Sequence, residues 1–288
     1  MDLAVRAISD KHNTKIAIVD LTEGFQEIVK LQKPNPLAMT ALGKVISNTV
    51  LLSLGLKDGD QMSVSLNGMG FAGNIVGEYE DKKFRGFVQF PDFSIDSIDK
   101  TKGAPSALSQ TVGVNGFIQA SRKQKGGQPY VSRTELITGE VNVDFMGYVQ
   151  QSDQVHTIIS STLKIDNNGN AEKLVGIMIQ LLPNSREEDI DFLEEKLGSL
   201  DHLNKTLTET KNYEALIKDI CEDAKILDNL ELTYGCSCSE EKVVDSIKML
   251  SRDEIEETYA NGEVVEVVCE FCKKKYSYDI EEVKNMFN

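Results

Sequence analysis

Cys236-Ser237-Cys238 and Cys269-Glu270-Phe271-Cys272 are two close cysteine pairs, separated by thirty residues near the end of the chain. Each short spacing lets one turn present two sulfurs to the same ion, and four thiolates are typical of a tetrahedral Zn²⁺ site. Chance alone would rarely place four cysteines in two such pairs. We therefore predict that Cys236, Cys238, Cys269 and Cys272 bind one Zn²⁺ per chain.

The fifth cysteine, Cys221, lies fifteen residues before the first pair, beside Ile220. A buried cysteine behaves as a small hydrophobic side chain, so we interpret Cys221 as packed rather than as a fifth ligand. Three lysines at 273–275 directly follow Cys272. They could favour the thiolate form of the second pair, although a solvated run of charge explains them equally well.

Charge is distributed unevenly along the chain. Residues 1–183 contain 18 basic and 19 acidic side chains, a net charge of −1, whereas residues 184–288 contain 13 and 27, a net charge of −14. All six prolines lie at or before Pro183, and all five cysteines lie after it. We therefore expect three parts: an N-terminal core domain at 1–183, a helical linker region at 184–230 and a C-terminal zinc-binding domain at 231–288.

The whole chain of 288 residues contains 31 lysines and arginines against 46 aspartates and glutamates, a formal net charge of −15. Such a charge gives no overall attraction to nucleic acid or to an anionic membrane. The first twenty residues lack the apolar stretch of a secretory signal, and the apolar run at 45–56 is too short to span a membrane. We expect a soluble, cytoplasmic protein whose partners are neither nucleic acid nor membrane.

Short apolar runs separated by glycine and turn residues make the first part β-rich. Strands are expected at 15–20, 26–31, 61–66, 74–79, 84–90, 116–120, 134–138 and 173–182, and helices at 37–56 and 142–152. These elements follow no regular βαβ alternation, which favours an α+β fold. The expected architecture is a β-rich N-terminal domain with packed helices, a helical middle segment and a small C-terminal zinc-binding module.

The middle segment is expected to be helical because apolar residues recur there at three- and four-residue spacing. Ile190, Leu193, Leu197 and Leu200 form one stripe on an acidic helix at 187–200, and a second helix is expected at 214–224. Helices this short must dock on another surface to be stable.

Two further patterns carry no function. The sequence Gly68-Met69-Gly70-Phe71-Ala72-Gly73 has a dinucleotide-binding spacing, but a β-type run follows where that motif needs a helix, so we interpret it as a glycine-rich turn. His12, His156 and His202 are scattered, without the pattern of a catalytic triad. We expect no catalytic residue, no organic cofactor site and no enzymatic activity.

The C-x-C pair, the thirty-residue gap and the C-x-x-C pair, at the end of a chain near 290 residues, together resemble the heat shock protein 33 family, the redox-regulated 33 kDa chaperonins. The resemblance covers nearly the whole chain. It includes residues 234–239 and 268–273 with Tyr276 in the tail, and residues 41–44, 112–116, 138–140, 152–154 and 176–183 further upstream.

This resemblance implies an ATP-independent chaperone, a holdase that binds unfolding proteins and prevents their aggregation during oxidative stress. The four cysteines would bind zinc in the reduced, inactive state. In the oxidised state they would form the disulfides Cys236–Cys238 and Cys269–Cys272, with zinc released. The resemblance also implies an active oxidised homodimer, with residues 1–183 responsible for client binding and dimerisation.

Physical chemistry makes sense of such a switch. Residues 231–288 carry 7 basic and 14 acidic side chains, a net charge of −7, and so small a module buries too little to fold securely alone. Metal binding supplies on the order of 10–16 kcal/mol of apparent folding free energy to such a site. Loss of zinc would unfold the module, undock the helices of 187–228 and expose the surface that they cover.

Two other functions remain open at the level of sequence. A zinc ribbon that binds nucleic acid would need a basic face, whereas this tail is acidic. A thiol–disulfide oxidoreductase would use Cys269 and Cys272 catalytically, but such a pair usually lies at a helix start in a βαβ setting.

Overall fold

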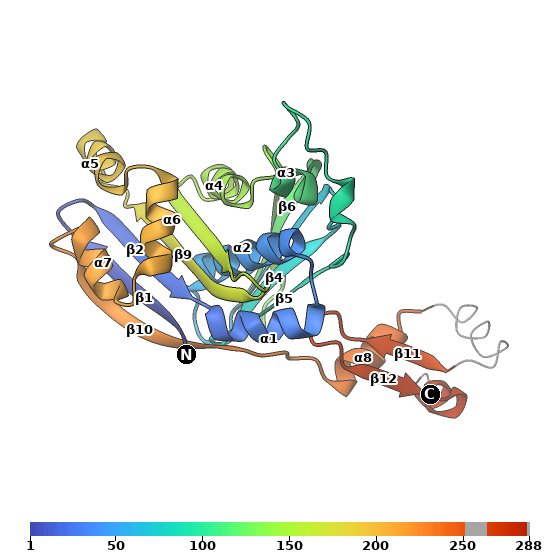
Figure 1. The fold of residues 1–288 in the computed structure, drawn as a ribbon. Coiled ribbons are helices and arrows are strands. Elements are labelled where there is room, and N and C mark those ends of the chain that lie inside the picture. The colour runs from blue at the N-terminus through green and yellow to red at the C-terminus, as the bar shows by residue number, and fades with distance from the viewer. Residues whose placement is uncertain (251–263, 287–288) are drawn as a thin grey trace. The chain divides into compact units, whose positions relative to one another are not determined.

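The computed structural model describes residues 1–250 and 264–286, so residues 251–263 and 287–288 of the expected 231–288 module lie outside the described residues. The chain divides into two compact units, Met1–Tyr234 and Gly235–Asn288. The first contains a large sheet with helices on both faces (Figure 1). The second contains the four paired cysteines. The α+β class is confirmed.

Ten strands form one sheet in the first unit, in the order β7-β6-β3-β4-β5-β10-β1-β2-β9-β8. In chain order they are β1 Asp2–Ser9, β2 Thr14–Asp20, β3 Gln61–Met69, β4 Ile75–Glu80, β5 Lys83–Val88, β6 Gly113–Lys123, β7 Pro129–Glu135, β8 Thr157–Ile165, β9 Ala171–Leu181 and β10 Lys225–Tyr234. Neighbours are antiparallel except β10 and β5, which pair in parallel through Thr233 with Lys83 and Tyr234 with Phe84. Strand β10 therefore joins the two halves of the sheet.

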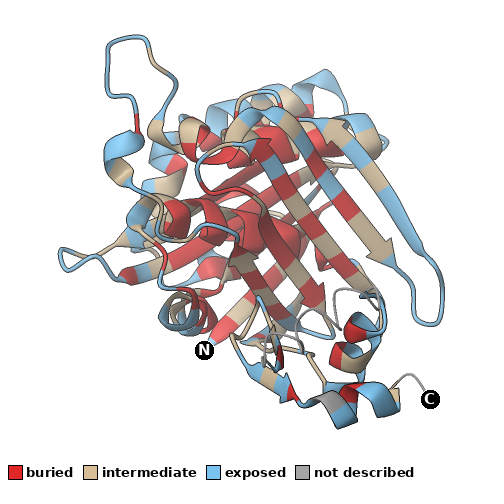
Figure 2. Ribbon diagram, turned by 90° about the vertical axis from the view of Figure 1, so that its right-hand side faces the viewer, coloured by how far each residue is buried: buried red, intermediate tan, exposed pale blue. Residues whose placement is uncertain are grey.

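Helix α2, Pro36–Ser53, fills the inner face of the sheet. It begins at a strong cap, because the Asn35 side chain accepts hydrogen bonds from the N–H groups of Leu37 and Ala38. Gly176 on β9 lets the helix approach closely, since a Cβ there would lie 2.4 Å from Ser47 Oγ. Figure 2 shows the buried residues concentrated in this interior. The remaining helical elements here are α1 Thr22–Gln32, α3 Ala107–Val112, α4 Val141–Ser152 and the short η1 Ile95–Ser97.

Three helices cover the opposite face of β1, β2 and β9, and we call them the helical cover: α5 Glu187–Leu197, α6 Leu200–Glu209 and α7 Tyr213–Ile220. Their apolar stripes pack on strand residues such as Ile16, Ile18 and Ile177 in a second core. The docking expected for the middle segment is thus found within the first unit. Residues 225–230 of that segment are not helical, because they belong to strand β10.

The structure corrects several local expectations. Residues 26–31 form part of helix α1 rather than a strand, because Phe25 and Ile28 bury one helical face while Leu31 remains exposed. The strand expected at 134–138 begins and ends earlier, as β7. Strands β1, β8 and β10 and helix α6 were not expected. The strands at 15–20, 61–66, 74–79, 84–90, 116–120 and 173–182 and the helices at 37–56 and 142–152 are confirmed, apart from shifted ends.

The second unit is small. It contains α8 Glu240–Ile247, the antiparallel strands β11 Val265–Val268 and β12 Lys275–Tyr278, and α10 Ile280–Met286. Its described core consists of five buried residues, Val243, Ile247, Val265, Tyr278 and Val283. Among the described residues of the chain, no helix is both long enough and apolar enough to cross a membrane.

Candidate functional site

The first cysteine pair lies in the short connection between β10 and α8. Ser239 ends this connection as the cap of α8, since its side chain accepts a hydrogen bond from Lys242 N. The ammonium of Lys242 donates back to the carbonyl oxygen of Ser237 at 2.9 Å. The start of the helix thereby fixes the turn that carries Cys236 and Cys238.

The second pair lies in the turn between β11 and β12. Cys269 N donates to the Lys274 carbonyl at 2.9 Å, and Lys273 N donates to the Cys269 carbonyl at 2.8 Å. Lys273 adopts the left-handed region with φ of 57°, which lets the chain reverse tightly enough for β12 to pair with β11. Both Cys269 and Cys272 are thus presented by one closed turn.

The two turns bring all four sulfurs together. Cys236 Sγ lies 3.7 Å from Cys269 Sγ, and Cys238 Sγ lies 3.4 Å from Cys272 Sγ. All four sulfurs lie within 4.8 Å of one another. A tetrahedral ion with Zn–S bonds of ~2.3 Å would separate its sulfurs by about 3.8 Å, so the arrangement fits a closed four-thiolate zinc site.

The protonation of the cluster also favours a cation. Burial acts to raise the pKa of the Cys238 thiol, but hydrogen bonds from Tyr276 and the neighbouring thiols outweigh it and lower that pKa to about 7. Burial, together with the neighbouring thiols, raises the pKa of Cys272 to about 12. One thiol of the cluster ionises readily, whereas each further thiolate is repelled by the first. A divalent cation would offset this repulsion between thiolates.

Comparison with known proteins agrees with this arrangement. The profile of the family described as "Hsp33 protein" matches residues 2–279. The chain belongs to the Hsp33 family. Hsp33 proteins are chaperones, so this protein binds client proteins as its partners.

Curated relatives of this Hsp33 family member are named "33 kDa chaperonin". The one from Thermodesulfovibrio yellowstonii is 28% identical over 99% of this chain and 98% of its own length, and the one from Lactococcus lactis is 27% identical over 100% of both. In fold, the chain resembles the crystal structure of the 33 kDa chaperonin of Thermotoga maritima, with a TM-score of 0.84 at 21% identity over 99% of this chain and 97% of that one.

The other candidate residues of this Hsp33 chain lie apart from the cysteine cluster. Cys221 is fully buried in the core beneath the helical cover, which confirms its interpretation as a packed side chain, and burial raises the pKa of its thiol. Gly68 and Met69 end strand β3, and Gly73 N then donates to the Gly70 carbonyl at 3.1 Å, so the chain reverses in a glycine-rich turn as expected. His156 and His202 are exposed.

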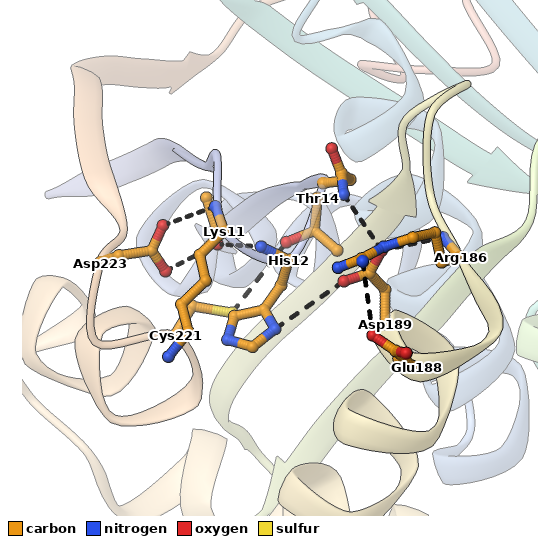
Figure 3. Close-up of polar contacts among 10 residues, drawn as sticks. Lys11, His12, Thr14, Arg186, Glu188, Asp189, Cys221 and Asp223 are labelled. Carbon is orange, nitrogen blue, oxygen red and sulfur yellow. Dashed lines mark hydrogen bonds and ion pairs between the residues drawn. The ribbon is translucent and has the colours of Figure 1, made fainter.

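The turn between β1 and β2 holds the start of helix α5, and Figure 3 shows His12 and Arg186 beside Asp189. The Asp189 carboxylate accepts hydrogen bonds from Asn13 Nδ2 at 3.1 Å and from Arg186 N at 2.8 Å. The His12 ring stacks on Phe192 with 3.6 Å between centroids, and its Nδ1 lies 3.9 Å from Asp189 Oδ1. Burial acts to raise the pKa of Asp189, but these hydrogen bonds and nearby charges outweigh it and lower that pKa.

The same turn also holds the chain just after helix α7. The Asp223 carboxylate accepts hydrogen bonds from Ser9 Oγ at 2.7 Å and from Lys11 N at 3.0 Å (Figure 3). We call residues 9–13 the turn latch, because they contact both ends of the helical cover. No sequence pattern indicated this role, since the contacts join residues that are more than 170 positions apart.

Proposed function

We propose that this chaperone is a redox-regulated, ATP-independent holdase that binds unfolding proteins and prevents their aggregation during oxidative stress. In the reduced, inactive form, Cys236, Cys238, Cys269 and Cys272 bind one Zn²⁺. The observation that carries the proposal is the convergence of these four sulfurs, all within 4.8 Å, in a unit with a described core of only five buried residues. Zinc acts here by holding a fold rather than as a Lewis acid.

Oxidation would remove the metal. With hydrogen peroxide, two zinc-bound thiolates give up two electrons and form one S–S bond, while the O–O bond breaks and its two oxygens take up two protons from solvent to give two waters. Two peroxide equivalents convert the four cysteines to the disulfides Cys236–Cys238 and Cys269–Cys272, and Zn²⁺ leaves because no thiolate remains to bind it. Two sulfur separations between the pairs are as short as 3.7 and 3.4 Å, so disulfide mapping is needed to test this pairing.

The first unit supplies a surface for clients. Beneath the helical cover, β1, β2 and β9 present an apolar face that includes Val5, Ile16, Ile18, Val175, Ile177 and Ile179. Unfolding of the zinc module would weaken the cover and expose this face together with the stripes of α5–α7. Contiguous exposed apolar surface of this kind binds unfolded chains. Activation is further proposed to produce a homodimer through residues 1–183.

We further propose that the protein is cytoplasmic, that it binds neither nucleic acid nor membrane, and that it catalyses no reaction. A zinc-ribbon role gains no support, because the second unit is acidic. An oxidoreductase role gains none either, because Cys269 and Cys272 lie in a hairpin turn rather than at a helix start.

The deciding experiment measures zinc release and suppression of client aggregation side by side in the full-length protein, with and without peroxide and without ATP. Peroxide should release one Zn²⁺ per chain and switch suppression on. Cys269→Ser should bind zinc poorly, whereas the matched control Cys221→Ala should bind and respond like the wild type. Full zinc retention in Cys269→Ser, or suppression that never depends on oxidation, would contradict the proposal.

A further inference from the structure

Tyr276 brings a hydroxyl group to the cysteine cluster. It lies on β12, opposite Val267 of β11, and its side chain is half-buried. Its Oη donates a hydrogen bond to Cys238 Sγ at 3.4 Å. The strand that follows the second cysteine pair is thereby linked directly to a sulfur of the first pair.

The two pairs receive different kinds of hydrogen-bond donor. Cys272 accepts a backbone hydrogen bond from Lys274, which the reversal of the C-x-x-C turn brings into reach. The C-x-C pair has one residue fewer with which to fold its own backbone around the sulfurs. At Cys238 the donor is a side chain from a different strand, Tyr276.

The three lysines at 273–275 differ in what their ammonium groups contact. Lys273 pairs with Glu270 at 2.6 Å, and Lys275 pairs with Glu266 at 2.9 Å. Lys274 instead lies over the Tyr276 ring, with its Nζ 4.6 Å from the ring centroid. A cation in this position draws electron density from the ring, which makes the phenol hydroxyl a stronger donor.

We propose that Tyr276 is a positioning residue of the metal centre, whose hydroxyl holds Cys238 Sγ toward the other three sulfurs and lowers the nucleophilicity of that sulfur when it is a zinc-bound thiolate. This inference rests on the proposed zinc site. One Zn²⁺ with four thiolates carries a net charge of 2 − 4 = −2, and a donor beside one sulfur offsets part of that charge. Partners of this kind orient and tune metal ligands. A sulfur that is already a thiolate becomes less nucleophilic when a donor lowers its basicity.

The test compares full-length Tyr276→Phe with Tyr278→Phe. Tyr278 is a matched control, because it lies on the same strand and its hydroxyl has no hydrogen-bond partner among the described residues. Tyr276→Phe should weaken Zn²⁺ and Co²⁺ binding by about 10-fold and shift the sulfur-to-cobalt charge-transfer band. In the zinc-bound protein, where every sulfur is a thiolate, iodoacetamide labelling mapped by mass spectrometry should rise at Cys238 by about 5-fold relative to Cys236.

A second variant separates the donor from the packing of the ring. Lys274→Met keeps the hydroxyl and removes the cation, so it should shift the cobalt band and the labelling of Cys238 in the same direction but by less. Unchanged band and labelling in Tyr276→Phe, with Co²⁺ still bound, would overturn the role of Tyr276. A wild-type protein that gave no four-thiolate cobalt spectrum would instead overturn the metal site itself.

Discussion

The Tyr213 hydroxyl donates a 2.5 Å hydrogen bond to Asp20 Oδ2, which ties the first residue of α7 to the last residue of β2. Beside it, Lys173 Nζ lies 5.4 Å from the Tyr213 ring centroid and donates to the Thr210 carbonyl at 2.7 Å, at the end of α6. One small set of polar contacts therefore fastens two helices of the cover to the sheet.

Tyr213→Phe should loosen the helical cover without disturbing the zinc site. A hydrogen bond to a charged group contributes about 1.5–3 kcal/mol, so amide exchange across α6 and α7 should accelerate by roughly 10- to 100-fold. The reduced variant should then suppress client aggregation in part. The exposed Tyr130→Phe serves as control. If amide exchange accelerates but the reduced variant still does not suppress client aggregation, the face beneath the helical cover is not the client-binding surface.

Asp189→Asn should weaken the turn latch in a pH-dependent way. The pKa of Asp189 is lowered in the folded protein, so its carboxylate stabilises the fold above the unfolded-state pKa of about 3.9, and that contribution is lost as the pH falls through the lower folded-state pKa. Urea denaturation should show the variant less stable by about 1 kcal/mol at pH 7. At pH 2–3 the difference should shrink.

Asp191→Asn is the matched control for the latch, because Asp191 lies on the exposed side of the same helix. It should unfold like the wild type at both pH values. An equal loss of stability in both variants would mean that removal of an acidic charge from α5, rather than disruption of the turn latch, destabilises the protein.

Removal of zinc under reducing conditions should unfold the second unit selectively. Because the described core of that unit has five residues, chelation should abolish amide protection across β11 and β12 while β1, β2 and β9 stay protected. Hydrogen exchange with and without a strong chelator measures this. Persistent protection of residues 265–278 after complete metal loss would show that the module folds without it.

Gly176→Ala should destabilise the first unit by about 1–3 kcal/mol through overpacking. Its new Cβ would lie 2.4 Å from Ser47 Oγ and 3.2 Å from Leu51 Cδ1, in the interface between β9 and α2. Gly55→Ala, where a Cβ meets nothing within 4 Å, should be close to neutral. Urea denaturation of both variants checks the comparison.

Local sequence patterns correctly predicted the features that depend mainly on residues close together in the chain. The cysteine spacings identified the four sulfurs that meet, and helical periodicity identified α2 and α5. Residues 26–31 were misread because a short apolar run is compatible with either strand or helix, and only contacts with the core decide between them. The backbone of β10 is placed by pairing with residues 2–8 and 83–84, which no local pattern reveals.

The same limit applies to the sites. The family resemblance included Tyr276, yet its contact with Cys238 spans 38 residues and depends on how two turns meet. The turn latch joins residues near position 12 to residues near 189 and 223. Both are products of tertiary packing, and single residues such as His12 carry no signal of it in the sequence.

Because β10 lies between β5 and β1 in the sheet, the sheet cannot be completed until late in translation. Strand β5 ends at residue 88 and β10 begins at 225, so 225 − 88 = 137 residues are added before the partner of β1 and β5 begins to emerge. At about 5–20 residues per second, translation leaves both strand edges open at the same time for roughly 7–27 seconds. Open edges recruit other chains, so ribosome-bound fragments of this chaperone should themselves be captured by the general chaperones that attend nascent proteins.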